Sequence, residues 1–380
     1  ADPLNVGKLL LAALGGPALL ERLNADPEQL LLLDTDEPSE SIAWEFAALP
    51  DHQFFVAQYG LLRLIDRPAP PAPAGNELHF VVLAADPLVD KQGHPREGYR
   101  LKLDDELRAI RRTLADSGVA LQARRAPPTQ AELRRALRRG PAILHLTCHG
   151  NVIETPGGQM AVLFLEDQNG GEDTLLGRDL VVMPPRGVLR LVLLSACHTA
   201  ETGTGHRAES HIARSLVVNG VPFAIGMQDA YPDDLSDEIA VGLYENVLAG
   251  HPLSESLRLA RQSLLQYPDA VGLPVGYTAR DGWGAIPLTQ GRPVVGGLGF
   301  PGNVALTGEV QPPRPLLGRN HELHALAELY SKGGKVVTVD GTGGMGKTAL
   351  AASFVERFGW RWPDGVLTIS FASDVVDAAI

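Results

Sequence analysis

Two apolar segments end abruptly at reactive side chains: Ile143-Leu-His-Leu-Thr-Cys-His149-Gly150 and Leu191-Val-Leu-Leu-Ser-Ala-Cys197-His198-Thr199. Each segment reads as a buried strand, the first delivering an imidazole and the second a thiol. Sites in parallel sheets lie at the carboxyl ends of the strands, so His149 and Cys197 are expected to lie close together. A histidine within hydrogen-bond reach can take the thiol proton, so the pair is typical of a cysteine hydrolase.

Strands and helices alternate around these segments. Apolar runs predict further strands at 78–84, 119–123 and 221–225, and helical spacing predicts helices over 103–114, 130–137, 212–218, 236–248 and 253–265. Strands separated by helices of this length predict an α/β fold, with a mostly parallel sheet covered by helices on both faces. The polar, Gly-rich stretches 151–174 and 199–210 are expected to be mobile loops bordering the site.

The length of 380 residues predicts more than one domain. We expect an N-terminal part of helices and strands over 1–75, with a helix pair broken at Gly15-Gly16-Pro17, a strand at 30–33 and a hairpin arm at 54–64. The expected core covers 76–308, a proline-rich linker 309–315, and a second, partial α/β module 316–380. The sequence begins without Met and ends inside this last module, which suggests a piece of a longer protein.

Charge and cysteine content exclude several classes of protein. The formal net charge of −12 argues against non-specific nucleic-acid binding. The arginines between Arg108 and Arg139 fall at helical spacing among acids, as on a solvated helix face. No apolar run reaches the roughly 18–20 residues that span a bilayer, and no leader is visible. Two cysteines are too few for a disulfide scaffold, which favours a reducing cytoplasm.

The two reactive segments are compatible with other interpretations. Cys148 and Cys197 could both be ordinary buried residues, since free cysteine is among the most buried residue types. A zinc site would need Cys148, His149, Cys197 and His198 on one metal, although adjacent residues of an extended chain point to opposite faces. A disulfide between the two cysteines would be an oxidation artefact.

Further motifs follow the two segments in a fixed order. They read Ile212-Ala-Arg-Ser-Leu, Gly220-Val-Pro-Phe-Ala-Ile-Gly-Met-Gln228 and Trp283-Gly-Ala-Ile-Pro-Leu, and upstream stands Ile42-Ala-Trp-Glu-Phe46. With the His149-Gly150 and Ser195-Ala-Cys197 strand ends, this series resembles the CHAT domain, a cysteine peptidase related to caspases and separases. The resemblance covers roughly residues 5–308.

The resemblance implies Cys197 as nucleophile and His149 as general base and acid. The backbone N–H groups of Gly150 and Cys197 are candidate oxyanion donors. In relatives, an acidic residue in the region of Asp233 and Asp234 shapes the pocket for the residue before the scissile bond, which implies a basic side chain there. The same two aspartates could instead cap the helix that begins near Ser236.

A second motif, Gly341-Thr-Gly-Gly-Met-Gly346-Lys347-Thr348, satisfies G-x-x-x-x-G-K-[ST] between a predicted strand at 336–339 and a predicted helix at 348–358. Gly341, Gly343, Gly344 and Gly346 let backbone N–H groups wrap phosphate oxygens. Lys347 would contact the β- and γ-phosphates and the Thr348 hydroxyl would hold Mg²⁺. The motif predicts ATP or ADP with Mg²⁺ as ligand.

The preceding segment, Leu316-Leu-Gly-Arg319-Asn-His-Glu322-Leu, resembles the element that opens the P-loop NTPase module of STAND proteins. In those relatives the element lies against nucleotide, so Arg319 is a candidate contact. A further strand is predicted at 366–371. No acidic strand of the Walker B type follows before Ile380, so residues 316–380 are not expected to complete a hydrolytic site.

Together the resemblances imply a cytoplasmic cysteine endopeptidase without a cofactor of its own, controlled by a nucleotide-binding STAND module through self-assembly. Its substrate would be a protein, such as a gasdermin-like or other effector target, in bacterial immunity or regulated cell death. No membrane or direct nucleic-acid partner is expected. Two alternatives are a catalytically silent scaffold, which the intact Cys-His pair argues against, and a nucleotide switch as the main function.

Overall fold

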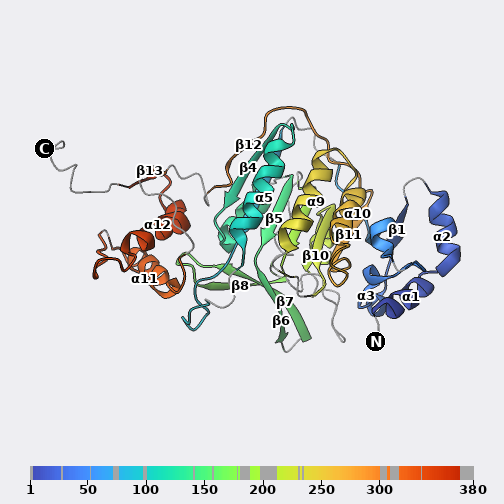
Figure 1. The fold of residues 1–380 in the computed structure, drawn as a ribbon, viewed down its shortest axis with the longest axis horizontal. Coiled ribbons are helices and arrows are strands. Elements are labelled where there is room, and N and C mark those ends of the chain that lie inside the picture. Colours follow the sequence, from blue (N-terminus) through green and yellow to red (C-terminus); the bar gives the residue numbers. More distant parts are fainter. Residues whose placement is uncertain are drawn as a thin grey trace.

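The computed structural model describes residues 3–26, 29–51, 53–71, 77–96, 101–139, 142–155, 158–177, 179, 189–196, 212–229, 232, 235–299, 306–308, 316–334 and 336–368. A nine-stranded sheet forms its centre, in the order β1-β2-β11-β10-β9-β5-β3-β4-β12 (Figure 1). Its strands are β1 (Leu30–Leu33), β2 (Gly60–Pro68), β3 (Leu78–Ala84), β4 (Leu121–Ala126), β5 (Ile143–Thr147), β9 (Leu191–Ser195), β10 (Phe223–Met227), β11 (Pro274–Arg280) and β12 (Val294–Gly297). All neighbouring pairs are parallel except β10–β11, which confirms the mostly parallel α/β fold.

Helices cover both faces of this sheet, as the alternation of elements predicts. Alternate residues of β3 serve two separate apolar cores, with Phe80 and Val82 on one side and Val81 and Leu83 on the other. The first core includes α5 (Leu103–Asp116), α9 (Ser236–Leu248) and α10 (Leu253–Ser263), and the second includes α6 (Gln130–Arg139) and α8 (Ile212–Val218). No helix in the described ranges is both long and apolar enough to cross a membrane.

The described residues of 151–174 lie mainly in a sheet, so the prediction of a mobile loop is wrong for this part. β6 (His149–Thr155), β7 (Gly158–Glu166) and β8 (Glu172–Leu176) form an antiparallel three-stranded sheet. Ala161, Leu163 and Leu165 of β7, which share one face of the strand, are buried in the second core. Asp167 Oδ1 accepts hydrogen bonds from the backbone N–H of Asn169 and Gly171, which closes the β7–β8 turn.

The N-terminal elements extend the central sheet. α1 (Pro3–Ala13) and α2 (Gly16–Ala25) confirm the broken helix pair, and α3 (Glu37–Glu40) is followed by a short 3₁₀ turn (Trp44–Phe46). The hairpin arm expected at 54–64 is wrong: α4 (Phe55–Gln58) leads into β2, which pairs parallel to β1. Parallel pairing requires a crossover connection, and residues 34–59 supply it.

The C-terminal segment contains α11 (Asn320–Ser331), α12 (Lys347–Phe358) and a 3₁₀ turn (Gly359–Arg361). The strand expected at 336–339 does not form, and Val336 is 85% exposed. The second predicted strand is present as β14 (Val366–Thr368), which pairs with β13 (Leu306–Gly308). The linker 309–315 lies outside the described residues. A third apolar cluster joins this segment to the sheet domain, because Phe354 and Phe358 of α12 pack with Leu88 and Val89.

Candidate active site

The two strands that carry the reactive residues lie side by side. β5 pairs parallel to β9, with Thr147 opposite Ser195, so His149 and Cys197 each follow two residues after this matched pair. Cys197 itself, like the whole of 197–211, lies outside the described residues. The described ends of the two strands, at Thr147 and Ser195, lie side by side at the same edge of the sheet.

His149 opens β6 and faces a buried carboxylate. Its Nε2 atom is 3.6 Å from Oδ1 of Asp86, whose side chain is 2% exposed, while the His149 side chain is 19% exposed. Asp86 follows β3, the neighbour of β5 on the other side from β9. Sequence reasoning missed Asp86, although a carboxylate just after the apolar strand Leu78–Ala84 was the available signal.

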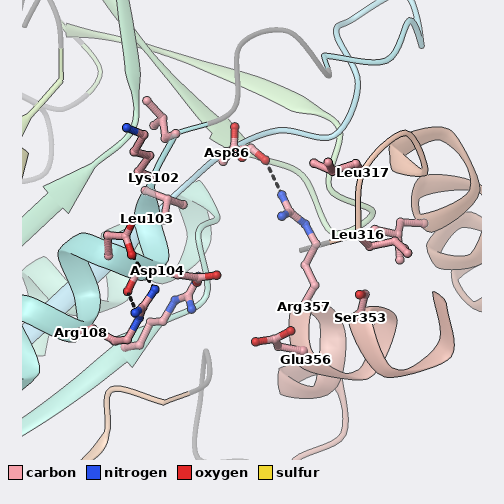
Figure 2. Close-up of a pocket in the computed structure, with 14 residues that line it drawn as sticks. Asp86, Lys102, Leu103, Asp104, Arg108, Leu316, Leu317, Ser353, Glu356 and Arg357 are labelled. Carbon is pink, nitrogen blue, oxygen red and sulfur yellow. Dashed lines mark hydrogen bonds and ion pairs between the residues drawn. The ribbon is translucent and has the colours of Figure 1, made fainter. Parts of the chain in front are cut away.

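A second buried carboxylate, Glu166 at the end of β7, supports the Asp86 segment. Glu166 Oε1 accepts a hydrogen bond of 2.9 Å from the backbone N–H of Asp86 and one of 2.8 Å from Nη2 of Arg357. The same Arg357 nitrogen donates to the backbone oxygen of Asp86 (Figure 2). Burial raises the pKa of Glu166, whereas Arg357 and the Asp86 N–H act in the opposite direction.

A buried polar network fixes β5 just before His149. The ring of His145 bonds through Nδ1 to the Tyr244 hydroxyl at 2.8 Å and through Nε2 to Thr147 Oγ1 at 2.6 Å. Thr147 in turn donates to Glu106 on α5 at 2.9 Å. Burial, with the Glu106 carboxylate, raises the pKa of Tyr244 well above its usual value. The network ties α5 and α9 to the strand that delivers His149.

Cys148 is separate from this arrangement. Its side chain is 2% exposed and packs in the second apolar core. In the part of the chain that the structure describes, no cluster of three or more His, Cys, Asp or Glu side chains could hold a metal ion.

Of the other predicted peptidase residues, the structure describes Gly150 but not the two aspartates. Gly150 lies in β6, opposite Leu163 of β7. Asp233 and Asp234 lie outside the described residues. The helix after them, α9, has Leu235 at its N-cap position and no side-chain capping bond there.

The glycine loop is a separate site at the start of α12. Gly341, Gly344 and Gly346 have φ values of 149°, 80° and 81°, in the region that favours glycine. Lys347 Nζ donates to the backbone oxygens of Gly341 at 2.7 Å and Thr342 at 2.9 Å, so its ammonium closes over the loop. Arg319 donates to Met345 O at 3.3 Å, which places it against the same loop.

These features define an α/β protein with a histidine–carboxylate site at the carboxyl edge of a mostly parallel sheet. Residues 4–293 match the family model of the CHAT domain, and the chain belongs to the CHAT domain family. None of the curated proteins compared with this chain matches it.

The chain is also similar in part to solved structures of other proteins. A chain of the Saccharomyces cerevisiae separase–securin complex is 12% identical with a TM-score of 0.42, over 66% of this chain and 15% of that chain. Gingipain R (RgpB), an Arg-specific cysteine proteinase, is 10% identical with a TM-score of 0.44, over 78% of this chain and 72% of that chain. The complex of the Porphyromonas gingivalis RgpB pro- and mature domains gives 8% identity and a TM-score of 0.45, with the same coverage.

Proposed function

We propose that this CHAT domain is a cysteine endopeptidase in which Cys197 and His149 form the catalytic dyad. The observation that carries the proposal is the register of β5 and β9, which pairs Thr147 with Ser195, each two residues before a proposed catalytic residue. His149 would accept the proton of the Cys197 thiol, and the thiolate would attack the carbonyl carbon of the scissile bond. The backbone N–H groups of Gly150 and Cys197 would stabilise the oxyanion.

The second half of the reaction reverses the proton transfer. His149 would donate its proton to the leaving amine as the C–N bond breaks, which leaves an acyl-enzyme on Cys197. Water, deprotonated by His149, would then hydrolyse the thioester. Mass-spectrometric identification of new N-termini in protein mixtures treated with this chain tests the proposal, with Cys197→Ala as control. A scaffold that only recruits a partner would produce no new termini.

Asp86 is proposed to orient His149. If Nε2–H points to Asp86, the other ring nitrogen, Nδ1, remains the base for the thiol. Asp86→Asn is therefore expected to lower kcat by on the order of 10²-fold, because an amide holds neither the tautomer nor the imidazolium. Steady-state kinetics with a cleaved peptide measures the effect. The matched control is Asp90→Asn in the same segment, where Asp90 pairs with the exposed His94; equal kcat in the two variants would remove Asp86 from the mechanism.

Substrate preference is proposed to depend on Asp233 and Asp234. A carboxylate in the pocket for the residue before the scissile bond would favour arginine or lysine there, through a charge-assisted hydrogen bond. A panel of short peptides that differ only at this position is expected to show that preference. A preference for acidic or apolar residues would contradict it.

The glycine loop is proposed to bind ATP or ADP with Mg²⁺. The residues fit such a ligand, since Gly344 and Gly346 are left-handed and nothing lies within 4 Å of a Cβ built at Gly343, Gly344 or Gly346, so the backbone can approach a phosphate closely. Lys347 would exchange its contacts with the Gly341 and Thr342 carbonyls for phosphate oxygens, and Arg319 would lie beside them. The Thr348 hydroxyl would hold Mg²⁺, which neutralises phosphate charge when bound.

Lys347→Ala is expected to weaken ADP binding by about 10- to 100-fold, the contribution of a hydrogen bond to a charged group. Calorimetric titration of the chain with MgADP measures it. Lys332→Ala serves as control, because Lys332 directly follows α11, is exposed and pairs with Glu328. Equal affinity in the two variants would show that the loop does not hold the phosphates.

We place this activity in the cytoplasm, within regulated cell death or immunity of a bacterium. The substrate would be a protein, a gasdermin-like or other effector target, and nucleotide-dependent self-assembly of the full protein as a STAND ATPase would control cleavage. The chain spans 15% of the separase chain that it resembles, so the activity of the complete protein is part of this proposal.

A further inference from the structure

We infer that Arg357, on the helix that follows the glycine loop, is a positioning residue for the proposed peptidase. Through Glu166 and the backbone of Asp86, Arg357 holds the carboxylate that faces His149. The inference rests on the proposed function, and it joins the C-terminal segment to the peptidase site by named contacts.

The contacts come from the Arg357 guanidinium, which bridges the end of β7 and the segment that follows β3. Its Nη2 atom donates to Glu166 Oε1 at 2.8 Å and to the backbone oxygen of Asp86. Glu166 Oε1 also accepts the Asp86 N–H at 2.9 Å, so the peptide groups on both sides of the Asp86 Cα are held. With both peptide groups fixed, the Cα of Asp86 has a defined position. From there the Oδ1 atom of Asp86 lies 3.6 Å from His149 Nε2.

Apolar packing places Arg357 at this position. Phe354 and Phe358 flank it on α12 and pack with Leu88 and Val89, which follow Asp86 by two and three residues. Leu88 and Val89 are 0% and 2% exposed. The C-terminal segment therefore covers the same stretch of chain that carries the His149 partner.

The local charges explain why a cation is needed. The Glu166 side chain is 4% exposed, and Asp86 adds a second carboxylate that raises its pKa further. Arg125 also favours the charged form of Glu166. The carboxylates of Asp104 and Glu356 in turn favour the charged form of Arg125. Arg357 is the cation in direct contact, and its loss leaves a buried carboxylate with the Asp86 N–H and the more distant Arg125.

The interface beside Arg357 is not fully packed. A cavity of about 360 Å³ separates α12 from α5, lined by Asp86, Arg125, Leu317, Ser353, Glu356 and Arg357 among others (Figure 2). Arg357 lies ten residues after Lys347 on the same helix, a distance of about 15 Å at 1.5 Å per residue. One helix thus begins at the proposed phosphate site and ends at the support of the proposed catalytic histidine.

The test is the rate at which a peptide chloromethyl ketone with arginine next to the warhead alkylates Cys197 in the 380-residue chain. Arg357→Met is expected to lower the maximal rate of alkylation by about tenfold or more, with the half-saturating concentration changed less than about twofold, because positioning acts on the chemical step rather than on binding. Arg357→Lys, which retains a cation, is expected to recover part of the rate.

The matched control is Arg361→Ala. Arg361 is an arginine of the same segment, and its hydrogen bonds, to Ala327 O at 3.1 Å and Ser331 Oγ at 2.8 Å, stay within that segment. Equal rates for Arg357→Met and Arg361→Ala would overturn the inference. A change in the half-saturating concentration alone, with the maximal rate unchanged, would overturn it too. If Arg357→Met fails to fold, Glu166→Gln, which removes the charge and keeps the shape, gives the same test. Absence of labelling in the unmodified chain would count against the proposed peptidase itself.

Discussion

Cleavage of any substrate of this protein is expected to fall to background in Cys197→Ala and by about 10²- to 10⁴-fold in His149→Ala. The first change removes the atom that would form the acyl-enzyme. The second removes the group that would accept the thiol proton and return it to the leaving amine. Both effects are measured as the rate at which the new N-terminus appears, at equal concentrations of folded protein.

The matched control is Cys148→Ala. Cys148 directly precedes His149, but its side chain packs among apolar residues of the second core and is 2% exposed. This variant is expected to retain cleavage, because it removes a small buried group on the other side of the strand. Cleavage that survives in Cys197→Ala and disappears in Cys148→Ala would exchange the roles of the two cysteines and contradict the account.

The largest expected effect on stability is the loss of Arg63 on β2. Its side chain is 1% exposed and forms a paired contact with Glu45, through Nε at 3.0 Å and Nη2 at 2.8 Å. Arg63 also donates to the backbone oxygens of Glu40 at 2.6 Å and Ile42 at 3.1 Å. Burial alone would lower the pKa of Arg63, but Glu45, Tyr277 and Glu40 raise it on balance, so the cation persists.

Arg63→Met is expected to lower the free energy of unfolding by about 3–5 kcal/mol, because it leaves Glu45 buried without its cation. Urea unfolding followed by circular dichroism measures the change. The control is Asp66→Ala on the same strand, since the Asp66–Arg280 pair is 70% and 55% exposed and is expected to contribute less than about 1 kcal/mol. A loss in Arg63→Met no larger than in this control would show that the ion cluster does not stabilise the fold.

The Arg63 cluster also gives a physical reason for the Ile42-Ala-Trp-Glu-Phe46 motif. Glu45 is fully buried, and the Trp44 indole donates to Ser39 O at 2.9 Å. The Glu45–Arg63 pair holds the turn between α3 and α4 against β2, and the Trp44 bond ties this turn to α3. The motif therefore has a structural role in closing the N-terminal side of the sheet.

Strongly apolar elements could be predicted from the sequence. The runs that became β3, β5, β9 and β10 are buried on both faces, and helical spacing located α5, α6, α9 and α12. The parallel strands β5 and β9, which precede His149 and Cys197 in the chain, followed from the same pattern. Local sequence is sufficient to predict a helix or strand where burial requires apolar residues at the spacing of that element.

Elements that depend on distant partners were not predictable in this way. β6 to β8 carry many polar and glycine residues, and their hydrogen bonds form mainly with each other. β11 was missed because it follows two helices and runs antiparallel to β10. The strand expected at 336–339 had the right composition, but Val336 remains 85% exposed, so composition alone did not form a ladder.

The contacts around His149 likewise could not be predicted from local sequence. Asp86 lies 63 positions before His149, and Arg357 lies 271 positions after Asp86. No short motif joins residues so far apart. The pairing of β3 with β5 brings Asp86 beside His149, and the packing of α12 on Leu88 and Val89 brings Arg357 beside Asp86. The proposed dyad of Cys197 and His149 could be suggested from the sequence, whereas the contacts of Asp86, Glu166 and Arg357 required the fold.

The most direct test of the dyad is peptide mapping by mass spectrometry after treatment with the arginyl chloromethyl ketone peptide. One adduct per chain is expected, located on Cys197, formed much more slowly in His149→Ala and at an unchanged rate in Cys148→Ala. An adduct located on Cys148, or an adduct on Cys197 that forms equally fast without His149, would contradict the proposed catalytic pair.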